Sequence, residues 1–588
     1  MHEMNAAGHW QGALSSSALA TAVAVAALAR QDAAGHRRLI DAGVQWLAQH
    51  ANADGGWGDT PDSISNLSTT LLCWSALACA GQDDAALRAA ADRAEAWLAG
   101  HADSVSPQAL ARAVLSHYGS DRTFSAPILT LAALAGRLGP ADGAWQLVPQ
   151  LPFELALFPP RLFKWLGLPV VSYALPALIA IGQVRHRLAP TRNPLRRAIR
   201  NLAARRTLGL LQRMQPANGG FLEATPLTGF VVLSLAACGH AGHPVAVRGA
   251  EFLRAAMRAD GSWPIDTNLA TWVTTLAVQA LSVQTAADSD FAKAWPECAE
   301  KISAWLLAQQ HLIEHPFTHA APGGWAWTDL PGGVPDADDT AGALLALRHL
   351  GPADTRIRAA AAAGVAWLLE LQNRDGGVPT FCKGWSALPF DTSCPDLTAH
   401  ALRAFHAWRD ELPASVQTRI DHAVPRALRY LAGAQRADGS WLPLWFGNQH
   451  AARHENPTYG TAQVVTALQD LPAPAGSAIA GMIASGCQWL AAAQQADGGW
   501  GGALGAPASI EETALATAAL ARGDAACRAA ATRGAAWLLA RTRTCQEFPA
   551  APIGLYFASL WYSEALYPLI FTVLALARVT GAPSQKSP

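Results

Sequence analysis

A glycine turn that follows a helix and leads into a large apolar residue recurs along this chain, and it constrains the fold more than any other feature. Most of the preceding helices end in Gln, and several carry a Trp-Leu pair. Glycine is favoured just beyond a helix C-terminus, so each unit predicts a helix, a turn and a buried plug. The instances are Gly55-Gly56-Trp57, Gly219-Gly220-Phe221, Gly261-Ser262-Trp263, Gly323-Gly324-Trp325, Gly376-Gly377-Val378, Gly439-Ser440-Trp441 and Gly498-Gly499-Trp500.

A second helix with its own signature follows each turn. It carries a Thr, then Ala or Ser six residues later, then Leu or Phe. From Thr274 to Thr513 the signature recurs every 52 to 66 residues. Repeating helix pairs of this length stack into solenoids or closed α/α barrels. The signature begins at Thr70, Thr228, Thr274, Thr340, Thr398, Thr461 and Thr513.

These patterns predict an all-α protein with two α/α barrel domains. The second helices are nearly all apolar, as in residues 276–281, so we expect them to form the inner rings. A chain of 588 residues is also too long for one ordinary compact core. We expect an N-terminal barrel over residues 32–268 and a C-terminal barrel over residues 269–588. Residues 1–31 should form an N-terminal helix that packs with the C-terminal barrel.

Composition narrows the classes of partner. The chain is 51% hydrophobic and only 15% charged, which suits a protein that rests on a membrane without spanning it repeatedly. A net charge of -1, without a dense Lys/Arg tract, argues against nucleic acid. Nine cysteines without a Cys-x-x-Cys pair, and an N-terminus without a signal pattern, favour a reducing cytosolic setting with no metal site.

Residues 147–189 form a different, apolar stretch within the N-terminal domain. It contains Phe153, Phe158, Phe163 and Trp165, and its uncharged run at 166–182 is interrupted by prolines. The run is too short and too broken for a transmembrane span, but with its flanking Arg and Lys residues it suits a face that dips into lipid headgroups. The alternative is a buried inter-domain helix.

Alignment of the inner helices on their Thr compares side chains at one end of the predicted barrel. The position two residues before the Thr holds Trp272, Asp338, Asp396, Tyr459 and Glu511, and His400 lies two residues after Thr398. An isolated acid here would be a helix cap, and an isolated histidine would be a core residue. The acids, the histidine and the aromatics are instead expected at one rim.

Asp336, Asp338 and Asp339 place three carboxylates within four residues, which exceeds what capping requires. Like charges this close oppose one another unless some of the groups hold protons. Crowding and an apolar cavity would keep Asp338 neutral, while a hydrogen bond from His400 would stabilise its anion after proton release. The sequence therefore predicts that Asp338 protonates an alkene.

The resulting carbocation would need a dry cavity with aromatic ring faces around it. Trp272, Trp327, Phe381 and Trp445 flank the acidic rim in sequence and are candidates for this role. For any one of them, core packing is the alternative.

At these residues the chain resembles the squalene-hopene cyclase and class II terpene cyclase family, over nearly its whole length. The resemblance rests on the Gln/Gly/Trp repeats, on Pro335-Asp336-Ala337-Asp338-Asp339-Thr340-Ala341 and on Asp396-Leu397-Thr398-Ala399-His400. It implies Asp338 as the acid, supported by Asp336, Asp339, Asp396 and His400. It also implies cation-stabilising roles for Trp272, Trp327, Phe381 and Trp445, and for Phe548 and Tyr562 in the C-terminal segment.

The resemblance further implies a monotopic enzyme on the cytoplasmic side of the cell membrane. Squalene is the expected isoprenoid substrate, no metal or other cofactor is expected, and a homodimer is compatible with the family. Three departures leave the substrate and product open. Val273 stands where the family has an acid, Leu72 replaces an acid in the first repeat, and residues 548–567 match only with gaps.

Several functions remain open at this point. The leading hypothesis is cyclisation of squalene to a polycyclic triterpene, and the second is the same chemistry on a shorter or oxygenated isoprenoid. A non-catalytic lipid-binding barrel is a third hypothesis, favoured by Val273. A protein prenyltransferase subunit would need a zinc site, and a barrel glycosidase would need a polar groove, and neither pattern is found.

Overall fold

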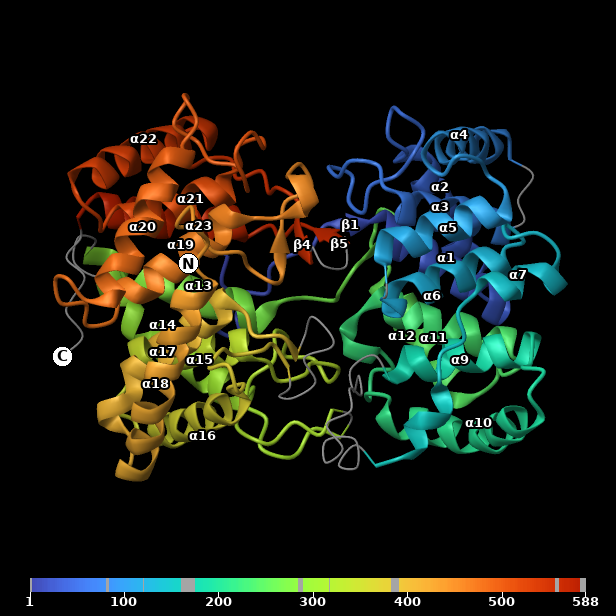
Figure 1. Ribbon diagram of the computed structural model, residues 1–588, viewed down its shortest axis with the longest axis horizontal. Helices are drawn as coiled ribbons and strands as arrows, with labels where there is room; N and C mark the ends of the chain where they lie inside the picture. The colour runs from blue at the N-terminus through green and yellow to red at the C-terminus, as the bar shows by residue number, and fades with distance from the viewer. Residues whose placement is uncertain are drawn as a thin grey trace.

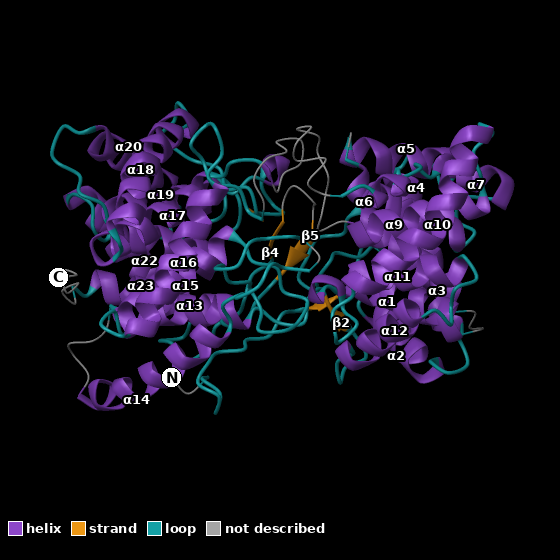
Figure 2. Cartoon of the chain, turned by 90° about the horizontal axis from the view of Figure 1, so that it is seen from below, coloured by secondary structure: helices purple, strands orange, loops and turns teal. Residues whose placement is uncertain are grey.

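The computed structural model describes residues 3–80, 84–119, 121–159, 175–283, 289–316, 318–381, 391–555 and 560–581. Two helical lobes lie side by side, and short strands lie between them (Figures 1 and 2). The predicted all-α fold with α/α barrels is confirmed.

The C-terminal lobe is a closed ring of inner helices covered by outer helices. Each inner helix packs against the next, and the last packs against the first. The inner helices are α13 (Ala270–Ser282), α15 (Ala337–Leu350), α17 (Pro395–Trp408), α19 (Pro457–Gln469), α21 (Ile510–Leu520) and α23 (Tyr567–Val579). The outer helices are α14 (Ser289–Ala308), α16 (Thr355–Leu371), α18 (Ala414–Ala434), α20 (Ala478–Ala493) and α22 (Ala525–Arg541).

The N-terminal lobe repeats this plan. Its inner ring consists of α1 (Ala18–Asp32), α3 (Leu67–Cys79), α6 (Arg122–Leu134), α9 (Leu175–Leu188) and α11 (Thr225–Ala237), and α11 packs back against α1. Around it lie α2 (Arg37–Gln49), α4 (Ala85–His101), α5 (Pro107–Tyr118), α7 (Ala141–Leu147), η1 (Phe153–Leu157), α10 (Pro194–Met214) and α12 (Pro244–Ala256).

Hydrogen bonds explain why turn and Thr recur together. The backbone N–H of Trp325, for example, donates to Thr340 Oγ1 (3.0 Å), and its indole donates to the Leu306 carbonyl of the preceding outer helix (2.8 Å). The Gln310 side chain donates to the carbonyls of Gly323 (2.8 Å) and Ala360 (3.0 Å), which fixes the turn to the next outer helix. Each repeat therefore satisfies buried polar groups that an apolar barrel would otherwise leave unpaired.

A side chain at the turn glycines would also lie too close to the neighbouring outer helix. Gly376 has a φ of 97°, and a Cβ placed there would lie 2.3 Å from the Arg426 carbonyl oxygen. Only glycine adopts this conformation without strain and lets the outer helix approach.

The N-terminal helix does not pack with the C-terminal barrel, so that prediction is wrong. Helix α1 belongs to the inner ring of the N-terminal barrel, between α3 and α11. The N–H of Trp263 donates to Thr21 Oγ1 of α1 (3.0 Å). The segment ahead of α1 reaches the other barrel, where the N–H of Trp10 donates to Thr274 Oγ1 (3.0 Å). The order of the sequence predicts that the turn at Trp263 bonds to the next inner Thr, Thr274. In the closed rings Trp263 bonds to Thr21 instead, and Thr274 bonds to Trp10.

Short strands join the lobes. The strand β1 (Ser16–Ser17) pairs antiparallel with β2 (Trp263–Pro264), which closes the N-terminal ring. The strands β3 (Phe446–Gly447), β4 (Ile553–Leu555) and β5 (Leu560–Tyr562) form an antiparallel sheet between the lobes. The buried Asp59 of the N-terminal lobe accepts from the N–H of Trp561 (2.7 Å), so this sheet is tied to both barrels.

The predicted membrane-facing segment 147–189 is only partly exposed. Residues 160–174, which include Phe163 and Trp165, lie outside the described residues. Helix α9 is one of the inner-ring helices, which we call staves, and its apolar surface is buried. Phe153 is also fully buried. For α9 and Phe153 the prediction of a membrane-facing surface is therefore wrong. Exposed apolar side chains remain at Leu155, Leu157 and Phe158.

Candidate active site

Asp336 forms the N-cap of α15 and leaves Asp338 free for other chemistry. Its carboxylate accepts from the backbone N–H groups of Asp338 and Asp339, both at 2.9 Å. A single side chain therefore satisfies the capping requirement of this helix. The Asp338 side chain is left to point away from the cap toward the next stave.

Asp338 meets His400 of α17. The Nδ1 atom of His400 lies 2.6 Å from Asp338 Oδ1, and the two side chains are 12% and 21% exposed, respectively. The indole of Trp272 on α13 stands edge-on to the imidazole at 6.2 Å between ring centroids. Three neighbouring staves therefore place an acid, a hydrogen-bonding histidine and an aromatic ring at one rim.

Burial makes the surrounding carboxyl groups hold protons. It raises the pKa of Asp336 to about 7, against hydrogen bonds from Asp339 that lower it. The pKa of Asp339 is raised well above its usual range, first by burial and then by the charge of Asp336. Burial, followed by the charge of Asp338, raises the pKa of Asp396 to about 7. The rim therefore stores protons near neutral pH, as an acid catalyst requires.

Asp396 has a partner that the sequence did not suggest. The Cys394 thiol donates to Asp396 Oδ1, and the N–H of Leu444 donates to Cys394 Sγ (3.2 Å). Tyr459 is also buried at this rim, and burial together with the charges of Asp338 and Asp396 raises its pKa far above the usual range. The Tyr459 hydroxyl therefore stays neutral beside the acid.

Trp327, Phe381 and Trp445 form an edge-to-face series. Ring centroids lie 6.2 Å apart between Trp327 and Phe381 and 5.7 Å apart between Phe381 and Trp445. The Trp445 indole donates to Thr380 Oγ1 (2.6 Å), and the carbonyl of Thr380 accepts from the N–H of Ala337 in the acid motif (2.8 Å). The aromatic series is therefore attached to the helix that carries Asp338.

The two C-terminal candidates differ. Tyr562 on β5 is partly buried against the core, with its hydroxyl oxygen 3.5 Å from that of Tyr567 at the start of α23. Phe548, between α22 and β4, is partly buried and lies outside the core cluster that surrounds the acid. The structure therefore brings Tyr562 near the rim and does not bring Phe548 there.

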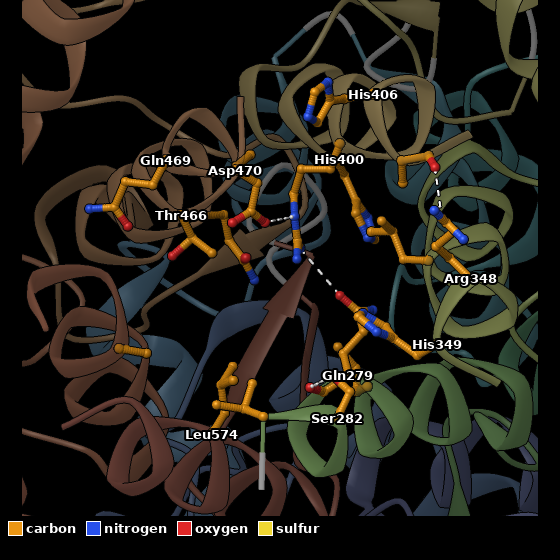
Figure 3. Close-up of a pocket in the computed structure, with 18 of the residues that line it drawn as sticks. Gln279, Ser282, Arg348, His349, His400, His406, Thr466, Gln469, Asp470 and Leu574 are labelled. Atoms are coloured by element: carbon orange, nitrogen blue, oxygen red, sulfur yellow. Dashed lines mark hydrogen bonds and ion pairs between the residues drawn. The ribbon is translucent and has the colours of Figure 1, made fainter. Parts of the chain in front are cut away.

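A cavity of about 970 Å³ runs from the acid rim through the lumen of the C-terminal barrel (Figure 3). On α13, α17 and α19 the lining residues recur at offsets of four, three and four residues, the spacing of one helix face. On α17 these residues are Asp396, His400, Arg403 and Ala407, and on α19 they are Tyr459, Gln463, Thr466 and Asp470. Extending the Thr alignment beyond the rim positions would have found the polar residues deeper in the lumen.

Val273, where the family has an acid, is fully buried in the apolar core. Leu72 is likewise buried in the N-terminal core.

Within the described ranges, no group of three or more His, Cys, Asp or Glu side chains is arranged to hold a metal ion. The acid network is therefore built from Asp336, Asp338, Asp339, Asp396 and His400.

Family models match both halves of the sequence. The squalene-hopene cyclase C-terminal domain matches residues 268–580, and the squalene-hopene cyclase N-terminal domain matches residues 1–207. The chain belongs to the squalene-hopene cyclase family. This family includes other class II terpene cyclases among the relatives found.

Individual relatives of this chain are distant. It is 27% identical to the terpene cyclase-glycosyl transferase fusion protein fsoA of Humicola fuscoatra, over 92% of this chain and 46% of that protein. It is 28% identical to the squalene-hopene cyclase of Alicyclobacillus acidocaldarius subsp. acidocaldarius, over 47% of this chain and 43% of that one. A 32% match to the drimenyl diphosphate synthase of Streptomyces showdoensis covers 42% of each chain. The chain thus spans less than half the length of these curated relatives.

One solved structure matches over nearly the whole length. The ent-copalyl diphosphate synthase of Streptomyces platensis superposes with a TM-score of 0.62 at 19% identity, covering 97% of this chain and 96% of that one. At this identity the likeness concerns the fold alone.

Proposed function

We propose that this cyclase protonates a terminal alkene of a linear isoprenoid, with squalene as the substrate, and guides polycyclisation of the carbocation. The observation that carries the proposal is the contact of 2.6 Å between Asp338 Oδ1 and His400 Nδ1. Beside this pair, the carboxyl groups of Asp336 and Asp396 have pKa values raised to about 7. General acid catalysis requires a protonated group that is stabilised once the proton has left. Asp336 and Asp396 hold protons beside Asp338, and His400 lies in a position to stabilise the Asp338 anion.

In the proposed first step, the O–H bond of Asp338 breaks and its proton adds to the hydrogen-bearing carbon of the terminal C=C. The alkene π electrons form the new C–H bond, the adjacent carbon becomes a tertiary cation, and Asp338 becomes a carboxylate. With a proton on Nδ1, His400 donates to Asp338 Oδ1 and stabilises that anion. Trp272 lines the cavity and can stabilise a cation there, whereas Trp327, Phe381 and Trp445 lie outside that lining, beside the segment that carries Asp338.

A shorter or oxygenated isoprenoid is the second candidate substrate. Two observations favour it: Val273 replaces a family acid, and one of the relatives is named a drimenyl diphosphate synthase. Incubation with squalene and, separately, with C15 and C20 isoprenoids distinguishes the two candidates by product analysis. Polycyclic products from the shorter substrates only would overturn the squalene assignment.

Asp338→Asn tests the acid assignment, because it removes the proton and preserves the shape. We expect turnover to fall by at least about 10³-fold, with folding and lipid binding retained. The matched control is Asp354→Asn, at the N-cap of the outer helix α16, and we expect it to keep full turnover. Unchanged turnover in Asp338→Asn would exclude Asp338 as the acid. A folded wild type that binds lipid without any turnover would instead favour the lipid-binding hypothesis.

We extend the proposal to a peripheral position on the cytoplasmic side of the cell membrane. Among the described residues, no helix is long and apolar enough to cross a bilayer. Exposed Leu195, Ile199 and Leu202 on α10 lie among exposed arginines, and η1 packs beside them with exposed Leu155 and Leu157. Apolar side chains within a basic surface suit anionic lipid headgroups. Sedimentation with anionic vesicles tests this, and recovery of all the protein in the supernatant would refute it. A homodimer stays a prediction.

A further inference from the structure

The lumen of the C-terminal barrel ends in a basic cluster that the proposed cyclisation does not use. It consists of Arg403 on α17, Arg522 just after α21, and Arg578 on α23, which meet around Asp470 at the end of α19. Asp470 and the neighbouring Gln279, His349 and Thr466 face one another across the same cavity (Figure 3). At about 1.5 Å per residue, the 11 residues from Tyr459 to Asp470 place this cluster about 16 Å from the acid rim.

The Asp470 carboxylate interacts electrostatically with all three guanidinium groups. Arg403 Nε donates to Asp470 Oδ2 (2.8 Å), and Arg522 Nη1 donates to Asp470 Oδ1. Burial alone would raise the pKa of Asp470, but Arg403, Arg522 and Arg578 together lower it to about 2. One carboxylate therefore faces three cations.

The other charged groups at this end do not balance the excess. Glu411 lies 3.8 Å from Arg348, and Asp410 is 86% exposed and paired with Arg409. Burial, followed by the charge of Arg403, lowers the pKa of His349 to about 4, so this imidazole is neutral at pH 7. The cluster thus carries about two uncompensated positive charges, and for Arg403, only 16% exposed, removal from water is costly without a counterion.

Arg578 has hydrogen-bond donors to spare. Its Nη1 makes long contacts with Thr466 Oγ1 (3.4 Å) and with the Ala518 carbonyl (3.3 Å). No residue in the described part of the chain accepts from its Nε or Nη2, and the side chain lines the cavity. A guanidinium fork in this position matches the oxygens of a phosphate group.

We propose that Arg403, Arg522 and Arg578 form a binding site for a multiply charged oxyanion of the phosphate or diphosphate type within the barrel lumen. The anion has two sources with the same chemistry. It is either free inorganic phosphate or diphosphate, or the diphosphate of a prenyl chain that extends along the apolar wall of Leu345, Leu515 and Leu574 toward Asp338. The second source rests on the oxygenated isoprenoid, the second candidate substrate of the proposed function, whereas anion binding itself does not.

Calorimetric titration of the full chain with inorganic diphosphate, and then with phosphate, tests the site at low salt. We expect saturable diphosphate binding that weakens as salt is raised, and that is at least tenfold weaker in Arg578→Gln. Arg522→Gln, whose side chain is 36% exposed, serves as a second variant if the first fails to fold. The matched control is Arg409→Gln, outside the lumen, and we expect it to keep wild-type affinity.

Absence of diphosphate binding at millimolar concentration would overturn the proposal, because helix carbonyls and water would then satisfy the cluster. Equal weakening in Arg409→Gln would overturn it as well. A raised KM for a prenyl diphosphate in Arg578→Gln, together with competition by inorganic diphosphate, supports the substrate headgroup as the source. Diphosphate binding without either effect supports a free anion. Asp338→Asn separates this proposal from the cyclase assignment, since it abolishes turnover and leaves diphosphate binding intact.

Discussion

Asp336→Asn isolates the proton that the acid motif stores. In the folded chain, burial raises the pKa of Asp336 from 3.8 to about 7. A shift of about 3 units corresponds to about 4 kcal/mol of free energy between the protonated and ionised forms. The folded chain therefore keeps a proton that the unfolded chain releases above about pH 4, so the free energy of unfolding falls as pH rises toward about 7.

Asparagine removes this titration and keeps the cap. Its amide oxygen can accept from the N–H groups of Asp338 and Asp339, which bond to Asp336 at 2.9 Å, and Asn is as good an N-cap as Asp. Between about pH 5 and pH 8, we expect wild type to lose about 3 kcal/mol through Asp336, and Asp336→Asn to lack that loss. Burial is also the largest cause that raises the pKa of the neighbouring Asp339, and this cause remains in Asp336→Asn.

Native-state hydrogen exchange of α15 peptides, measured across this pH range, reports the change locally and avoids averaging over two barrels. Asp354→Asn is again the matched control. Its carboxyl group is 30% exposed, and a hydrogen bond from Arg356 lowers its pKa, so its removal leaves the wild-type slope above pH 5. Identical pH dependence in wild type and Asp336→Asn would refute the reasoning.

Two further predictions concern the rim and the closure of the N-terminal ring. As pH rises through about 7, Asp396 ionises, and its negative charge opposes formation of the Asp338 carboxylate, so we expect turnover to fall. Asp396→Asn should remove this limb from the kcat profile, and an unchanged limb would exclude the coupling. Thr21→Val leaves the N–H of Trp263 without its acceptor at 3.0 Å, so we expect the N-terminal barrel to lose about 1–3 kcal/mol and Thr21→Ser to restore it. Urea unfolding followed by hydrogen exchange measures the loss, and destabilisation of the C-terminal barrel instead would contradict the observed ring closure.

The sequence by itself determined the repeat and the acid motif, because both depend on local chemistry. The glycine turn, the plug and the inner Thr lie within about 20 residues of one another, and their hydrogen bonds are made within one repeat. The acid motif could be read in the same way, since Asp336 caps the helix that presents Asp338. Helical spacing then placed His400 and Trp272 on the same rim.

Only the tertiary structure decided how the rings close. The turn at Trp263 bonds to Thr21, 242 residues away, and Trp10 bonds to Thr274, because each ring takes its closing partner from a distant part of the chain. The C-terminal ring also gathers Arg403, Asp470, Arg522 and Arg578 from four consecutive inner helices or their ends into one lumen. Helical spacing places these residues on the inward face, but their contacts exist only once neighbouring helices of the ring pack together.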